Sequence, residues 1–142
     1  MKMKRITVMV IFAALALPGL AAAASRIADQ EVAVFEQGAG QCQSSPGDAE
    51  RIRCVAEALQ RLGSGLQRGN VSEIAPQAAP AMRKAGADVA AARTRPAALS
   101  ALNRAQAVVR SLAAKSSGEA TAVYGHLMRA LSRAQAAIGG RG

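Results

Sequence analysis

The stretch EATAVYGHLMRALSRAQAAI, residues 119–138, decides the fold of this chain. Its apolar side chains recur every three or four positions, so they lie along one face of a helix. These residues are Ala120, Val123, Tyr124, Leu127, Met128, Leu131, Ala134 and Ile138. His126, Arg129 and Arg133 point the opposite way. Because an amphipathic helix of this kind is not stable alone in water, the rest of the chain must cover its apolar face.

A second helix has a clear start signal, with Ser45 as its cap, Pro46 in its first turn and an acidic group at Asp48. On its outer face, Glu57 and Arg61 have the spacing of an i,i+4 ion pair. Its apolar stripe comprises Ile52, Val55, Ala56, Leu59, Leu62 and Leu66. The stripe predicts an amphipathic helix that ends near Arg68-Gly69.

Other stretches also have helical patterns, and the connections between them are short. The expected helices span residues 26–39, 46–68, 80–93, 96–115 and 119–138. The third is rich in alanine, which predicts a thin helix that its neighbours approach closely. Before the last helix, Ser116-Ser117-Gly118-Glu119 predicts a turn and a Ser-x-x-Glu capping box. With no strand pattern, the sequence predicts an all-α fold: a small four- to five-helix bundle, partly antiparallel up-and-down, with one disulfide staple.

The staple is expected between the two cysteines of the chain, Cys42 and Cys54. In an exported protein such a pair favours a disulfide, which for a loop of this size stabilises the fold by about 3 kcal/mol. It would join the first helix to the second on a flank away from the apolar stripe. The alternatives are an intermolecular bridge, or free thiols with a redox or metal role. A thioredoxin-like motif or a haem attachment site is not indicated, because the spacing is not C-x-x-C.

Export is predicted from the N-terminus, which has the three parts of a secretory signal peptide. Basic residues precede an apolar run over residues 6–17, and small residues follow before Ser25. Residues 1–24 are therefore predicted to be removed by cleavage between Ala24 and Ser25, with cleavage after Ala23 as the alternative. An uncleaved anchor is disfavoured, because a membrane span needs roughly 20 apolar residues.

This reading predicts a periplasmic or secreted protein with no transmembrane span after cleavage. Residues 25–138 would form a single helical domain, and residues 139–142 a frayed tail.

Charge is unevenly distributed after the predicted cleavage site. Residues 25–57 carry a net charge of −3, and residues 58–142 a net charge of +9. A basic region of this size can attract anionic lipid, lipopolysaccharide, nucleic acid or an acidic protein. Nucleic acid is disfavoured because export separates the chain from it and no aromatic platform is present. The candidate anionic-partner patch is Arg104, Lys115, Arg129 and Arg133, and the competing interpretation is that these charges only solvate helix faces.

No catalytic, metal or cofactor site is indicated, because no nucleophile with a base, no paired carboxylates and no phosphate-binding loop are found. His126 is the only histidine, and its direction predicts a solvated side chain. Small exported four-helix cytochromes have a comparable outline, with Met82 or Met128 as a haem partner for His126. That interpretation is disfavoured, because Met128 points into the core and no C-x-x-C-H motif is present.

One internal similarity leaves two interpretations open. Residues 101–109 and 130–138 share six identities in nine positions. Duplication of a helical hairpin would produce such a spacing, and so would chance in an alanine-rich helical chain.

Together these features predict a non-enzymatic exported helical protein that binds another protein or self-associates in the bacterial cell envelope. The first alternative is a basic binder of anionic surfaces, such as lipopolysaccharide or phospholipid headgroups. The second is a small periplasmic stress chaperone. Salt distinguishes the first alternative, because binding to phosphate groups weakens steeply with ionic strength.

Overall fold

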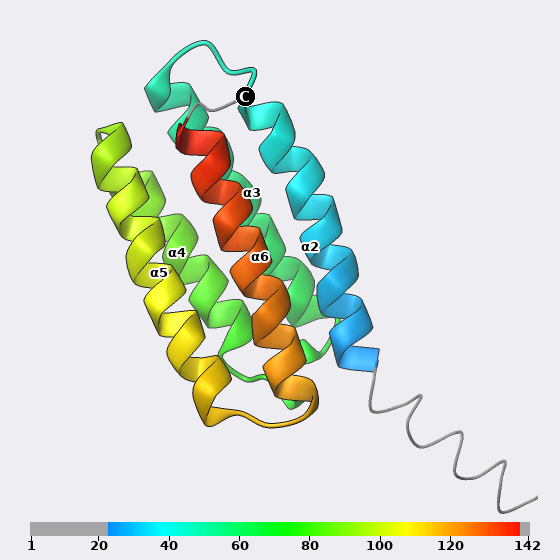
Figure 1. The fold of residues 1–142 in the computed structure, drawn as a ribbon. Coiled ribbons are helices and arrows are strands. Elements are labelled where there is room, and N and C mark those ends of the chain that lie inside the picture. The colour runs from blue at the N-terminus through cyan, green and yellow to red at the C-terminus, as the bar shows by residue number, and fades with distance from the viewer. Residues whose placement is uncertain (1–22, 140–142) are drawn as a thin grey trace, which may run out of the picture.

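The structure, a computed structural model, describes residues 23–139, which form five α-helices and one short 3-10 helix (Figure 1). The α-helices are α2 (Ala23–Cys42), α3 (Asp48–Arg68), α4 (Ala78–Ala91), α5 (Arg95–Lys115) and α6 (Glu119–Gly139), and the 3-10 helix is η1 (Val71–Glu73). No strand occurs in this part of the chain. The predicted all-α fold is confirmed, with five helices in the described residues.

The five helices are arranged in a ring, in which α2, α3, α4, α5 and α6 follow one another and α6 packs back against α2. Short connections reverse the chain between successive helices, so neighbours in sequence run antiparallel (Figure 1). The closing pair is different. Ser25 contacts Glu119 near the start of both helices, and Gly40 lies beside Arg133 near their other ends. In a ring with an odd number of helices, α2 and α6 must therefore run parallel.

The core is built from the apolar faces that helical periodicity predicts. In α6, Val123, Tyr124, Leu127 and Leu131 are at most 2% exposed. The Tyr124 hydroxyl accepts a hydrogen bond from the backbone N–H of Gln77 at 3.3 Å, so its polar atom also has a partner. Met128, predicted on the same face, is only partly buried at the edge of the core.

Glycines allow α3 and α4 to pack closely. A Cβ atom added at Gly63 would lie 3.1 Å from the Ala79 carbonyl oxygen. One added at Gly86 would lie 3.0 Å from the Ala56 carbonyl oxygen. The alanine-rich helix therefore contacts its neighbour almost backbone to backbone, in agreement with the prediction of a thin helix.

Both predicted helix caps are wrong. Gly47, rather than Ser45, is the N-cap of α3, and no side chain caps that helix. The capping box before α6 does not form either: the Ser116 hydroxyl donates to the Leu112 carbonyl at 2.7 Å. Glu119 instead accepts the backbone N–H of Ser25 at 2.9 Å. Before α6, the side chains of Ser116 and Glu119 thus each have a different partner from the one that the capping box assigns.

The ends of α2 also differ from the prediction of a helix over residues 26–39. The helix continues through Gly38 and Gly40 to Cys42, because Ala39 and Cys42 are buried and hold this last turn against its neighbours. Of the predicted signal peptide, only Ala23 and Ala24 belong to the described residues, and both lie in α2. Of the predicted tail, Gly139 ends α6 and residues 140–142 lie outside the described residues. Among residues 23–139, no helix has the length and apolar character needed to cross a membrane.

Candidate functional site

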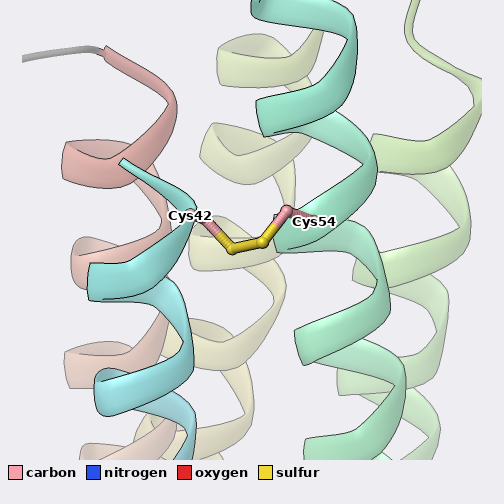
Figure 2. The surroundings of a disulfide bond; sticks show 2 residues. All are labelled: Cys42 and Cys54. Carbon is pink, nitrogen blue, oxygen red and sulfur yellow. A yellow bond between two sulfur atoms is a disulfide. The ribbon is translucent and has the colours of Figure 1, made fainter. Parts of the chain in front are cut away.

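A disulfide between Cys42 and Cys54 joins the last residue of α2 to the second turn of α3 (Figure 2). The two Cα atoms are 5.6 Å apart, and the described residues contain no free cysteine. Cys42 is fully buried, whereas Cys54 is half-buried at the seam between the helices. The predicted intramolecular bridge is confirmed, and it fixes one end of the α2–α3 pair.

A groove of about 330 Å³ extends along this seam from the disulfide. The α2 side is lined by Glu31, Val34, Phe35, Gly38, Gln41 and Cys42, and the α3 side by Cys54, Ala58, Arg61, Leu62, Ser64 and Arg68. Steps of three and four residues place each set along one helix face. The volume falls at the lower end of the range of about 300–1,000 Å³ found for ligand pockets.

Val34 makes this groove unusual. Its side chain is 67% exposed, more than Val108 at 51% or Ile74 at 42%, the other exposed large apolar residues of the described chain. Beside it, a Cβ atom added at Gly38 would meet no atom within 4 Å. The groove therefore presents an apolar side chain next to open space on the surface of the bundle.

Arg53 of α3 is exposed beside residues 90–93 at the end of α4, and four further exposed charged residues lie on the outer side of α3: Glu50, Glu57, Arg61 and Arg68. All four are exposed, and none has an ion-pair partner within 4.0 Å in the described part of the chain. The expected Glu57–Arg61 ion pair is therefore wrong. Exposed pairs of this kind gain little against side-chain entropy and solvation. We call the groove residues of α2 together with these four residues the α2–α3 face.

The four residues of the predicted anionic-partner patch lie on different sides of the bundle. Arg104 lines a small surface hollow between α4 and α5 and donates to Ser100 Oγ at 3.1 Å. Lys115 is the exposed last residue of α5. Arg129 and Arg133 lie on the side of α6 that faces α2. The structure therefore does not bring these side chains together on one surface.

Arg129 is also balanced by carboxylates. Its Nη2 atom is 2.8 Å from Asp29 Oδ1, and its Nε atom is 3.4 Å from Glu36 Oε2. The hydrogen bond from Arg129 holds the pKa of Asp29 below its ordinary value, and the charges of Arg129 and His126 act in the same direction. The hydrogen bond to Asp29 likewise raises the pKa of Arg129. This arginine serves mainly to join α2 to α6.

His126 is placed differently from the prediction. Its side chain is only 24% exposed, and its Nε2 atom lies 3.1 Å from the Ser25 hydroxyl. On the other side of the ring, Nδ1 is 3.7 Å from Asp29 Oδ1 and 3.4 Å from Arg129 Nη1. The expectation of a solvated histidine is wrong, because α2 covers this flank of α6.

The resulting Ser25–His126–Asp29 cluster does not have the spacing of a serine nucleophile with a base and an orienting carboxylate. His126 Nδ1 is 3.7 Å from Asp29 Oδ1, which is longer than a hydrogen bond, and Arg129 holds this carboxylate more closely, at 2.8 Å. A catalytic histidine needs a hydrogen bond from Nδ1–H to the aspartate and an Nε2 atom that accepts the serine proton.

Sequence reasoning could not find this cluster, because Ser25 and His126 are 101 positions apart and only the packing of α2 against α6 brings them together. Within residues 23–139, no group of three or more His, Cys, Asp and Glu side chains is arranged to hold a metal ion. In comparisons with known proteins, no family model, no curated protein and no solved structure matches the chain.

Proposed function

We propose that this chain is a non-enzymatic exported helical protein of the bacterial cell envelope that binds another protein, or self-associates, through the α2–α3 face. The observation that carries the proposal is Val34, which stands 67% exposed beside a groove with open space at Gly38. Recognition of one helix by a groove between others uses apolar side chains at such helical spacings. No other exposed large apolar residue of residues 23–139 protrudes as far.

Export is supported by the signal-peptide pattern of residues 1–24 and by the Cys42–Cys54 disulfide. Disulfides persist in oxidising compartments and are rare in the bacterial cytosol. A periplasmic or secreted location is therefore part of the proposal.

The non-enzymatic part of the proposal is supported by the cluster at the α2–α6 seam. The Nδ1 atom of His126 lies 3.7 Å from Asp29 Oδ1, whereas a catalytic triad needs a hydrogen bond from Nδ1–H to the carboxylate. The carboxylate of Asp29 is bound more closely by Arg129 than by His126, at 2.8 Å against 3.7 Å. We interpret these groups as a structural connection between two helices.

The alternatives have less support. A binder of lipopolysaccharide or phospholipid headgroups needs one basic surface, but Arg104 and Arg129 lie on different sides of the bundle. On the α2–α3 face, Glu50 and Glu57 would oppose an anionic surface. A periplasmic stress chaperone would expose apolar faces on partial unfolding; in the folded chain, the exposed large apolar side chains of the described residues are scattered and give this alternative no support.

The test is photo-crosslinking of the exported protein in intact cells. A photoreactive amino acid replaces Val34 in one variant and Val108 in the matched control, since both sites are exposed on helices. We expect adducts with protein chains at position 34 and few at position 108. Lipid adducts at position 34 would favour the anionic-surface alternative, and an absence of protein adducts at position 34 would contradict the proposal.

A further inference from the structure

The outer stripe of α3 has an unusual order of charges. At 100° per residue, Glu50, Glu57, Arg61 and Arg68 lie within about 40° of one another. Two acids occupy the first half of the stripe and two bases occupy the second half. The order is symmetric about Leu59, since Glu57 and Arg61 are two positions from it and Glu50 and Arg68 are nine positions from it.

Such a stripe complements itself. If α3 meets a second α3 antiparallel about a two-fold axis at the level of Leu59, each residue faces the one equally distant on the other side. Glu57 then faces Arg61 of the second copy, and Glu50 faces Arg68 of the second copy. The symmetry repeats both contacts, so all eight charges meet an opposite charge. An interface of this type, in which the same patch serves both subunits, is the commonest in homodimers.

We infer that the partner of the α2–α3 face is a second copy of this chain, docked with α3 antiparallel to α3 about Leu59. The inference rests on the proposed function and names the partner. The four charges are exposed and have no ion-pair partner within the described residues, so they are available to pair with a second copy.

The same two-fold axis also places Val34 near the second copy. Cys42 is bonded to Cys54, and the Glu31 carboxylate lies against Gly65, so the register of α2 against α3 is known. In this register Val34 is level with Leu62, three residues from the axis, and Gly38 is one residue from it on the other side. With a rise of 1.5 Å per residue, Val34 comes within about one turn of Gly38 in the second copy. The open space beside Gly38 can then accept the exposed valine.

Charge complementarity also favours a second copy over a uniformly charged partner. A surface with only phosphates would attract Arg61 and Arg68 but repel Glu50 and Glu57. A second copy places an opposite charge against the acidic residues and against the basic residues. Because these pairs are exposed, salt should weaken the dimer.

The test is sedimentation equilibrium of the exported protein, with its disulfide intact, over a range of concentrations at low salt. The wild type is expected to dimerise reversibly. R61E places Glu57 opposite a glutamate in both symmetric contacts, so the dissociation constant should rise at least about tenfold. R104E is the matched control, because it makes the same charge change on an exposed arginine of α5. Its dimer dissociation constant should stay within about twofold of the wild-type value.

A mixing experiment tests the register itself. Alone, E57R and R61E should each be mainly monomeric, because like charges face each other in their homodimers. Mixed, they form a heterodimer in which both central contacts join opposite charges, and the affinity should return to near that of the wild type. A mixture of E57R with R104E has the same overall charges and should not form this heterodimer. Circular dichroism establishes that each variant is folded.

Several results would overturn the inference: a wild type that stays monomeric, equal effects of R61E and R104E, or no heterodimer from E57R and R61E. Failure here is separable from failure of the proposed function. Crosslinks from position 34 to other proteins, with a monomeric purified chain, would reject the second copy and retain the binding protein. If position 34 captured no protein and the purified chain were monomeric, both proposals would be rejected.

Discussion

Arg129 of α6 donates a hydrogen bond to Asp29 of α2 at 2.8 Å, and so joins the one neighbouring pair of helices in the described bundle that runs parallel. All other neighbours around the ring are linked by a short connection. The closing pair has none, because α2 and α6 are the first and last described helices. Side-chain contacts at this seam therefore replace the missing connection, and Glu36 adds a second partner for Arg129 at 3.4 Å.

This ion pair predicts a pH dependence of stability. Because Arg129 lowers the pKa of Asp29 in the folded state, ionised Asp29 favours folding. The contribution is present above the unfolded pKa of about 3.9 and is lost as the pH falls through the lower folded pKa. We expect D29N to flatten the dependence of the unfolding free energy on pH below ~5. Urea unfolding of the wild type and of D29N at a series of pH values measures this pH dependence. An unchanged slope in D29N would contradict the assignment.

The disulfide should contribute a large share of the stability of so small a bundle. Replacing both cysteines (C42A with C54A) is expected to lower the unfolding free energy by about 2–4 kcal/mol, as for other loops of this size. Denaturant unfolding with and without a reductant measures the effect. Reduction should destabilise the wild type but leave the double variant unchanged. Equal sensitivity of both proteins to reductant would show that the bridge is not the cause.

Alanine should have opposite effects at Gly63, where α3 packs closely against α4, and at Gly125 of α6, where there is open space. At Gly63 an added Cβ would lie 2.8 Å from Arg83 Cγ and 3.1 Å from a backbone oxygen, so G63A should cost about 1–3 kcal/mol. At Gly125 an added Cβ would meet nothing within 4 Å, so G125A should stabilise α6 by about 0.5–1 kcal/mol. Thermal unfolding compares the two. If G63A also stabilised the protein, the described close approach would be incorrect.

Processing at the predicted signal cleavage site would change a hydrogen bond into an ion pair. The backbone nitrogen of Ser25 donates to Glu119 Oε2 at 2.9 Å. Cleavage after Ala24 would make this nitrogen a charged amino terminus that already faces a carboxylate. Intact mass spectrometry of the exported protein should give a chain that begins at Ser25 and gains two hydrogens on reduction. A chain beginning at Ala24 would instead support cleavage after Ala23, and one beginning at Met1 would exclude removal of the signal.

The helices could be predicted because amphipathic periodicity is a local property of the chain. Val123, Leu127 and Leu131 form one face whatever packs against them, and all three are buried. The disulfide could be predicted because only one intramolecular pairing of Cys42 and Cys54 exists. In both cases, positions close in sequence carried the information.

Features that depend on the ring could not be predicted in this way. The solvated His126 and the capping box at Glu119 were wrong because α2 returns to α6 and supplies Ser25 and Asp29. No local pattern shows which helix closes a ring. The charge order of α3 is visible in the sequence, but its meaning depends on knowing that α2 and α4 leave this stripe exposed.

The most direct test of the central claim, that the α2–α3 face is the surface through which this protein contacts another chain, is nuclear magnetic resonance of the isotope-labelled protein. Backbone amide shifts are compared between dilute and concentrated samples. The account predicts concentration-dependent changes clustered in residues 31–42 and 50–68, centred near Val34 and Leu59. Changes clustered around Val108 on α5, or spectra that do not depend on concentration while the crosslinker at position 34 captures no protein, would contradict it.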